Sequence, residues 1–213
     1  MRWMWVVAFA VALAPAAALA DDKAKLAGEF SAKLTIDEQP GGKHFQGVWL
    51  QTELRSLPRP GEIDRSSFVI DYRAREVWRG FEGERVVARG TCYHPSGQAI
   101  AGVHFELERL RLAGKPSGVA PFLEVGPQVM LAGELVALAG GKDLVFRSGS
   151  TIYGIAGSSV ERPLAAGKVT VNARTVVINP KVVTATAKEH IWVLGVYERA
   201  PEPDKSRAYY RCK

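Results

Sequence analysis

Cysteine is nearly absent from this chain, which holds Cys92 and Cys212 in 213 residues. Two thiols so far apart exclude the cysteine-rich zinc modules, whose ligands lie a few residues from one another. The H-E-x-x-H, G-x-S-x-G and G-x-x-x-x-G-K-[ST] patterns of zinc peptidases, serine hydrolases and phosphate loops are also missing. The sequence therefore gives no support to these catalytic classes, and we expect no cofactor and no bound metal.

Helical patterning and long hydrophobic runs are missing as well. After residue 20, no segment of ten or more residues shows a convincing 3.6-residue apolar period, and none approaches the length of a membrane span. The 21 glycines and 12 prolines indicate many turns instead. We therefore predict an all-β protein.

The first 20 residues are unlike the rest of the chain. Arg2 precedes an apolar run at residues 5–13, and an Ala-Leu-Ala motif ends at Ala20, before two aspartates. This is the pattern of a secretory signal peptide, and the run is shorter than the roughly 20 residues that a membrane span needs. We expect cleavage near Ala20 and a periplasmic or secreted protein.

Export would bring both cysteines into an oxidising compartment, where an even pair usually forms a disulfide. Cys212 ends a tail, residues 200–213, whose proline, serine and charged residues give it no apolar pattern of its own. We expect an intramolecular Cys92–Cys212 bond that draws this tail back to the first half of the chain. The alternative is a buried Cys92 and a free Cys212 that pairs between molecules.

Period-two alternation predicts five strands in each half of the chain. They cover residues 29–36, 43–54, 67–72, 85–93 and 100–112, and then 128–138, 143–147, 150–155, 168–178 and 190–197. The break between the two series contains AGKPSG, a linker composition. We divide the chain into a signal peptide at 1–20, a first domain at 28–112, a linker at 113–120, a second domain at 121–199 and the tail.

The two halves also repeat each other. His104 and His190 open the last predicted strand of each half and match at an offset of 86, so we expect them to have the same structural role. Apolar parity changes near Glu108 and Arg109, which predicts a β-bulge, and Gly195 marks the corresponding bend. A second block matches at an offset of 84: Gly83, Val87 and Thr91 with Gly167, Val171 and Thr175.

Five short strands in about 80 to 90 residues, with the longest connection between the third and fourth, are typical of the Greek-key barrel called the OB-fold. The stretch VGPQVMLAGELVALAGGKDLVFRSGSTIYGIAGS resembles the OB-like modules of uncharacterised exported bacterial proteins. The resemblance implies a fold and no catalytic residue. We predict an all-β chain of two tandem five-stranded OB-like Greek-key barrels, with a β-sandwich as the alternative.

Cations and aromatic residues are interleaved in the first half, as in OB barrels that hold single-stranded nucleic acid or sugar chains. They are Arg73, Arg75, Trp78, Arg79, Phe81, Arg85, Arg89 and Tyr93. From this region we select as ligand-binding candidates Arg73, Trp78, Arg89, Tyr93 and His94. A structural alternative is that Trp78 and Phe81 plug the barrel mouth.

The formal net charge of +6 is mild, and acids lie between the cations. We expect an exported, non-enzymatic binding or interaction module of a bacterial cell envelope. Its partner would be an anionic polysaccharide or another envelope protein, and not nucleic acid, which an exported protein rarely meets. One alternative is a polysaccharide-acting enzyme with Glu106 and Glu108 as acid and base, about 7 Å apart on one side of a strand. Another is a structural subunit of a surface or secretion assembly.

Overall fold

The computed structural model describes residues 25–36, 47–52, 67–71, 75–94, 104–115, 120–138, 143–184, 187–201 and 207–212. Strands dominate these ranges, so the predicted all-β class is confirmed. Within them, no helix is long and apolar enough to cross a membrane. The predicted signal peptide lies outside the described residues.

The strands of the first half pair in a closed cycle. They are β1 (Gly28–Ile36), β2 (Val48–Thr52), β3 (Ser67–Asp71), β4 (Arg85–His94) and β5 (His104–Leu112). β1 pairs with β2 and β4, β3 pairs with β2 and β5, and β4 pairs with β5, so that the order around the cycle is β1-β2-β3-β5-β4. The β3–β5 pairing is parallel and the other four are antiparallel.

The second half repeats this topology. Its strands are β6 (Phe122–Ala137), β7 (Leu144–Ser148), β8 (Thr151–Ser158), β9 (Gly167–Ile178) and β10 (Glu189–Tyr197). They pair in the order β6-β7-β8-β10-β9, β9 returns to β6, and the β8–β10 pairing is again the parallel one. The same cycle with the parallel pairing at the same place supports the inferred duplication.

Every predicted strand is present, with differences at the ends. β6 begins at Phe122 and not at residue 128, because register breaks between Phe122 and Glu124 and between Val125 and Gln128 interrupt the alternation that marks a strand. Residues 43–46, 53–54 and 100–103, predicted as strand, lie outside the described residues. Two short helical elements, α2 (Arg75–Trp78) and η1 (Arg79–Phe81), occupy a predicted connection.

The predicted bulges are confirmed at equivalent positions. Arg89 pairs with Arg109 and Gly90 with Leu107, which leaves Glu108 as the extra residue of β5. In β10 the register shifts between Val193 and Gly195, which leaves Leu194 as the extra residue. Glu108 and Leu194 are related by the offset of 86 that relates the two histidines, so both last strands bend at the same point.

The second block of the predicted repeat is wrong by one residue. Tyr93 is paired with His104 and Val176 with His190, so β4 and β9 are related by 83 residues and not by 84. A one-residue shift turns every side chain of a strand to the other face. The sequence could not separate the two registers, because Val and Ala recur along both strands and match almost equally well in either.

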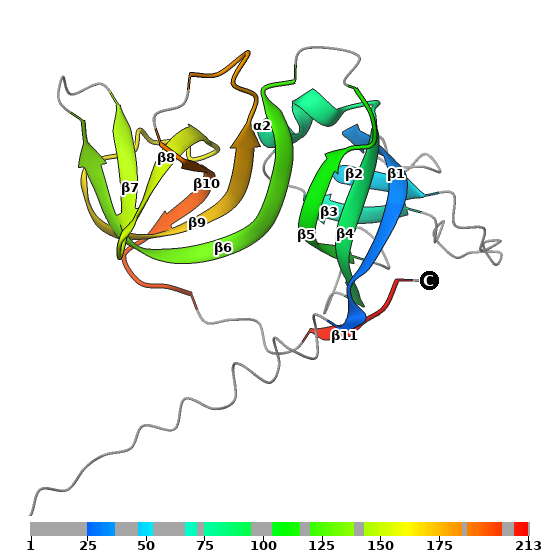
Figure 1. The fold of residues 1–213 in the computed structure, drawn as a ribbon. Coiled ribbons are helices and arrows are strands. Elements are labelled where there is room, and N and C mark those ends of the chain that lie inside the picture. The colour runs from blue at the N-terminus through cyan, green and yellow to red at the C-terminus, as the bar shows by residue number, and fades with distance from the viewer. Residues whose placement is uncertain are drawn as a thin grey trace, which may run out of the picture.

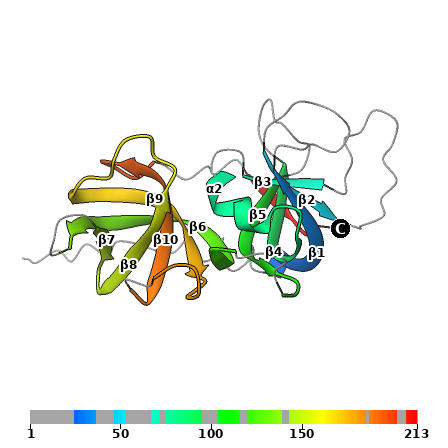
Figure 2. The same cartoon turned by 90° about the horizontal axis from the view of Figure 1, so that it is seen from above.

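The two halves are joined more closely than a linker would join them. β5 pairs directly with β6 at Leu110–Val125 and Arg111–Glu124, so both cycles belong to one continuous mixed sheet. α2 lies between the halves (Figure 2), and its buried Trp78 belongs to one apolar cluster with Phe122 and Ile178 of the second half. Residues 116–119 of the predicted linker lie outside the described residues.

The C-terminal segment returns to the first half, where β11 (Ala208–Tyr210) lies against β4 (Figure 1). Cys92 of β4 and Cys212 form the predicted intramolecular disulfide, with 5.3 Å between their Cα atoms. β11 pairs with residues 92–94, beyond the point where the β1–β4 ladder ends at Gly90. In the second half, the equivalent part of β9 pairs with the first residues of β6. β1, the counterpart of β6, does not extend this far along β4, and β11 of the tail pairs there instead.

Candidate functional site

Of the five ligand-binding residues predicted from the sequence, the structure describes the side chains of three, and these lie in different environments. Arg73 and the side chain of His94 are outside what the structure describes. Arg89 is on the outer face of β4, where its side chain is 45% exposed and its Nε lies 3.0 Å from Glu108 Oε2. Trp78 and Tyr93 are in two other environments.

Trp78 is fully buried between the two halves of the molecule. The guanidinium carbon of Arg174, on β9, lies 5.1 Å from the centre of its ring, in a cation–π arrangement. Arg174 is itself 3% exposed, and its Nη1 donates a hydrogen bond to the carbonyl of Gly126. Trp78 therefore contributes to the packing of the halves and has no surface with which to stack on a ligand.

Tyr93 lies beneath the C-terminal segment. Its ring contacts His104 edge-on, and the Arg207 guanidinium lies 4.7 Å from the ring centre. Tyr209 of β11 donates a hydrogen bond to Glu106, and Arg207 Nη1 lies 3.7 Å from the same carboxylate. Burial and then the hydrogen bond to Glu106 raise the pKa of Tyr209 to about 12. The tail thus covers this end of β4 and β5.

His104 and His190 occupy equivalent, buried positions, and the Nε2 atoms of both have no hydrogen-bond partner in the described part of the chain. Any structural role that the two histidines share therefore does not depend on a hydrogen bond at this atom. Burial, and then the positive charge of Arg207, lower the pKa of His104 to about 4. Burial also lowers the pKa of His190.

Glu106 and Glu108, the acid and base of the enzyme hypothesis, are engaged by different partners. Glu106 accepts the hydrogen bond of Tyr209, whereas Glu108 accepts one from Arg89. Glu108 is also the unpaired residue of the bulge, whereas Glu106 is opposite Thr91.

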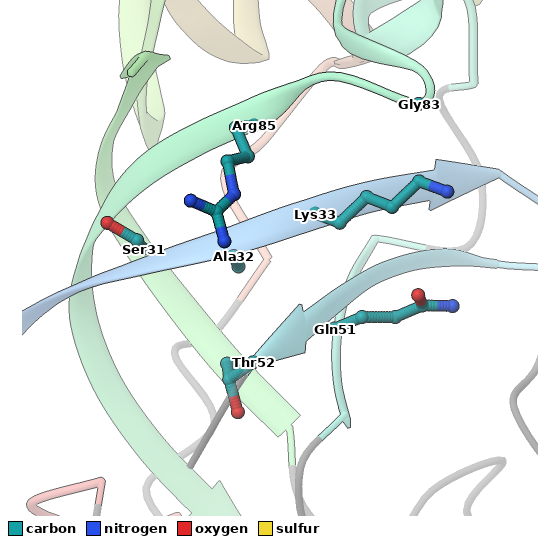
Figure 3. Close-up of a pocket in the computed structure, with 7 residues that line it drawn as sticks. All are labelled: Ser31, Ala32, Lys33, Gln51, Thr52, Gly83 and Arg85. Atoms are coloured by element: carbon teal, nitrogen blue, oxygen red, sulfur yellow. The ribbon is translucent and has the colours of Figure 1, made fainter.

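A pocket of about 350 Å³ lies on the outer face of the first half, where β2 ends beside β1 (Figure 3). Its lining residues come from β1, β2, β4 and the turn before β4: Ser31, Ala32, Lys33, Gln51, Thr52, Gly83 and Arg85. They supply two cations, two hydroxyls and one amide, and no acid is among them. We call this cavity the Lys33 pocket.

The two cations of the Lys33 pocket face each other across neighbouring strands. Lys33 of β1 is directly opposite Arg85 of β4 and also opposite Gln51 of β2. Side chains in such positions lie on the same face with their Cβ atoms about 5 Å apart, and like charges there destabilise the sheet by roughly 0.2–1 kcal/mol. The pocket therefore has two cations at opposed positions of neighbouring strands.

The corresponding row of the second half has a different charge pattern. The registers that relate β4 to β9 place Glu134 at the position of Lys33, opposite Lys168 on one side and Arg147 on the other. An acid between two cations stabilises that row, whereas the first half has a lysine at the same point. An acid can thus hold this position in the same topology, and the lysine of the first half marks the Lys33 pocket as the candidate functional site.

A second pocket, of about 380 Å³, lies at one end of the second half. Apolar residues of β9, including Val177 and Ile178, line it together with Tyr153 and His190. Glu124, Lys188 and Glu189 give it charges of both signs. It therefore has no charge preference, and the buried Nε2 atom of His190 is too inaccessible to serve a ligand.

The residues of the Lys33 pocket were not among the candidates predicted from the sequence. Arg85 was among the interleaved cations, but Lys33 and Gln51 appeared only as polar positions in alternating strands. The charge pattern becomes visible once the pairing of β1, β2 and β4 is known, because the three residues are far apart in the sequence. The register that reveals it also corrects the repeat alignment.

Among the described residues, no group of three or more His, Cys, Asp or Glu side chains could hold a metal ion. Comparisons of the chain with protein families, curated proteins and solved structures find no match.

Proposed function

We propose that this protein is an exported, non-enzymatic binding module that holds an anionic group in the Lys33 pocket. The observation that carries the proposal is the pair of cations, Lys33 and Arg85, at opposed positions of two strands, in a cavity that has no acid among its described lining residues. A bound anion would be attracted to both cations. Ser31, Gln51 and Thr52 would add neutral hydrogen bonds around it.

The strand order supports the finer description of each half as a five-stranded OB-like barrel. In each half the first strand pairs with the second and the fourth, and the fifth closes the cycle by a parallel pairing to the third. A sandwich of two separate sheets does not predict such a cycle. OB barrels bind ligands on the outer faces of their strands, and the Lys33 pocket is on such a face.

Two features support export to the cell envelope. The first 20 residues have the pattern of a cleavable signal peptide. The Cys92–Cys212 bond is the kind of crosslink that persists in an oxidising compartment. The envelope contains acidic polysaccharides and proteins with acidic surfaces, either of which could present an anion to the pocket.

The test is a titration with inorganic sulfate at low ionic strength, followed by NMR shifts of backbone amides in oxidised protein lacking residues 1–20. We expect shifts centred on Ser31 and Lys33, and about fivefold weaker binding in Lys33→Gln. Lys168→Gln is the matched control, since it removes one exposed cation from the equivalent row of the second half. Equal affinities of the native protein and Lys33→Gln, or shifts confined to the second half, would refute the proposal.

A further inference from the structure

The Lys33 pocket continues onto the neighbouring strands. Ser31, which lines the pocket, is opposite Val87 of β4, and Val87 is opposite Arg111 of β5. Residues that face each other in register point to the same side of a sheet, so Arg111 shares the outer face with Lys33 and Arg85. The three cations come from three adjacent strands.

Arg111 differs from the other arginines of this face in its contacts. Arg89 is bonded to Glu108, and Arg109 Nη2 lies 2.7 Å from Glu124 Oε2. Arg111 has no hydrogen bond or ion pair with any residue that the structure describes. Glu124 is opposite Arg111 in the ladder, but its carboxylate also accepts a hydrogen bond from Arg109 Nε. The charges of Arg89 and Arg109 are thus balanced within the protein, whereas that of Arg111 is not.

The second half lacks this row of cations. Glu134 is at the position of Lys33. Tyr197 is at the position of Arg111, because Tyr197 is opposite Thr170 in the second half and Arg111 is opposite Val87 in the first. Neither Glu134 nor Tyr197 is a cation, so this face of the second half has less positive charge. The fold therefore does not require a cation at the positions of Lys33 and Arg111.

The spacing of the cations indicates an extended ligand. Lys33 and Arg111 are on β1 and β5 with β4 between them, which separates their strands by about 9.5 Å. Arg85 lies between them, because Arg111 is opposite Val87, two residues along β4 from Arg85. A chain with regularly repeated anionic groups can contact all three cations.

The side chains around the cations indicate a sugar chain. Sites for single-stranded nucleic acid need exposed rings on which bases stack. Trp78 and Phe81, the aromatic residues next to the pocket in sequence, are fully buried, and none of the described residues that line the pocket is aromatic. Ser31, Gln51 and Thr52 offer instead the hydroxyl and amide groups that bond to sugar hydroxyls.

We propose that the outer face of β1, β4 and β5 is a track for a linear acidic polysaccharide, with one anionic group in the Lys33 pocket and a later one on Arg111. This inference rests on the proposed function and names the class of its ligand. Only the first half provides the track. A chain bound in this way runs across the strands of the first half from β1 toward β5.

The experiment compares galacturonate with its linear hexamer by isothermal titration at low ionic strength, using oxidised protein lacking residues 1–20. We expect the hexamer to bind at least about tenfold more tightly than the monomer, because the second contact is intramolecular. Arg111→Gln should weaken hexamer binding by about threefold to fivefold and leave sulfate binding at the pocket unchanged. Lys33→Gln should weaken both, and Arg147→Gln, which removes an exposed cation from the second half, should weaken neither.

Other results of these titrations would refute the track, or both proposals. If sulfate shifts the Lys33 amide but the hexamer binds no more tightly than the monomer, or Arg111→Gln binds it like the native protein, the track is refuted and the pocket stands. If neither sulfate nor the hexamer binds, both proposals fail. A heparin hexasaccharide tests whether sulfate groups replace carboxylates. A single-stranded hexanucleotide that binds more tightly than both sugars overturns the assignment to polysaccharide.

Discussion

The charge of residue 33 determines whether the side chains opposite it on the neighbouring strands meet a like or an opposite charge. In the second half, Glu134 is opposite Lys168 and Arg147, so opposite charges occupy paired positions. In the first half, Lys33 is opposite Arg85, so like charges occupy the same paired positions next to a cavity. A lysine at this residue favours binding of an anion more than it favours stability of the sheet.

Reversing the charge of Lys33 should separate the two effects. We predict that Lys33→Glu raises the free energy of unfolding by about 0.5 kcal/mol, because an acid then faces Arg85. The same change should abolish sulfate binding. Urea denaturation and NMR titration measure the two quantities. A destabilised variant, or one that still binds sulfate, would contradict this account of the pocket.

The protonation of His104 should make stability depend on pH. Its folded pKa of about 4 is below the ordinary value of 6.5, so the unfolded chain binds the proton more readily between these values. The contribution of the neutral imidazole is complete above pH 6.5 and falls as the pH decreases toward 4. We predict a loss of about 2 kcal/mol across this window, after allowance for solvent screening.

His104→Leu is the variant that tests this. It cannot be protonated, so the difference in unfolding free energy between native protein and variant should change across the window. His190 and the carboxylates titrate in both proteins and cancel in the comparison. Parallel pH profiles for the two proteins would show that His104 is not the source.

At the scale of elements, the β-bulges fix which face of each last strand is buried. In β5 the buried residues are Phe105 and Leu107 before the bulge and Leu110 after it, a change of parity that the extra residue Glu108 makes possible. Leu194 has the same place in β10. Because the bulge changes the spacing of apolar residues, it was visible in the sequence as a break in alternation.

Deletion of Glu108 should therefore be more harmful than loss of its side chain. The deletion removes the bulge, because Arg109 then follows Leu107 directly, while Leu107 and Leu110 stay on the buried face. We predict a loss of about 1 to 3 kcal/mol, since the strand loses the bend that the bulge introduces. Glu108→Ala, which removes only the exposed ion pair with Arg89, should change the unfolding free energy by less than about 1 kcal/mol. Similar effects of both changes would argue against a structural bulge.

At the scale of the whole molecule, two sets of contacts join distant parts of the chain: a shared apolar cluster joins the halves, and the C-terminal tail is attached to β4. Trp78, Phe122 and Ile178 lie in one apolar cluster, so the halves share a core through α2. The tail then crosses from the end of β10 to β4, where β11 and the disulfide attach it. Arg211 donates a hydrogen bond to the carbonyl of Lys25, so these two segments meet in the first half, although the second half lies between them in the chain.

Removing the disulfide should weaken the attachment of the tail to β4. The bond joins residues that are 120 positions apart, and on the chain-entropy model such a loop stabilises the folded state by about 4 to 5 kcal/mol. We predict a destabilisation of up to about 4 kcal/mol for the Cys92→Ser/Cys212→Ser variant in chemical denaturation. Amides at residues 92–94 should also exchange faster, since a three-residue strand lacks its anchor. Unchanged stability together with unchanged exchange would show that β11 holds its place without the bond.

The sequence alone determined the elements whose patterns are local. Period-two alternation identifies a strand within itself, so the strands of both halves, the bulge near Glu108 and the all-β class could be predicted. The pairing of the two cysteines followed from their number and the expected compartment. Short helices such as α2 escaped prediction, because one turn carries too little periodicity to be recognised.

Only the tertiary structure decided which residues meet. Pairing registers made Lys33 a neighbour of Arg85, brought Arg111 onto the same face, and showed that Trp78 belongs to the shared core and not to a binding surface. They also placed the tail on β4, at the edge that β1 leaves uncovered. The physical reason is that strand alternation specifies which face a side chain occupies, but not which strand lies beside it. The neighbours, and with them the charge pattern of the site, follow from hydrogen bonds between segments far apart in the chain.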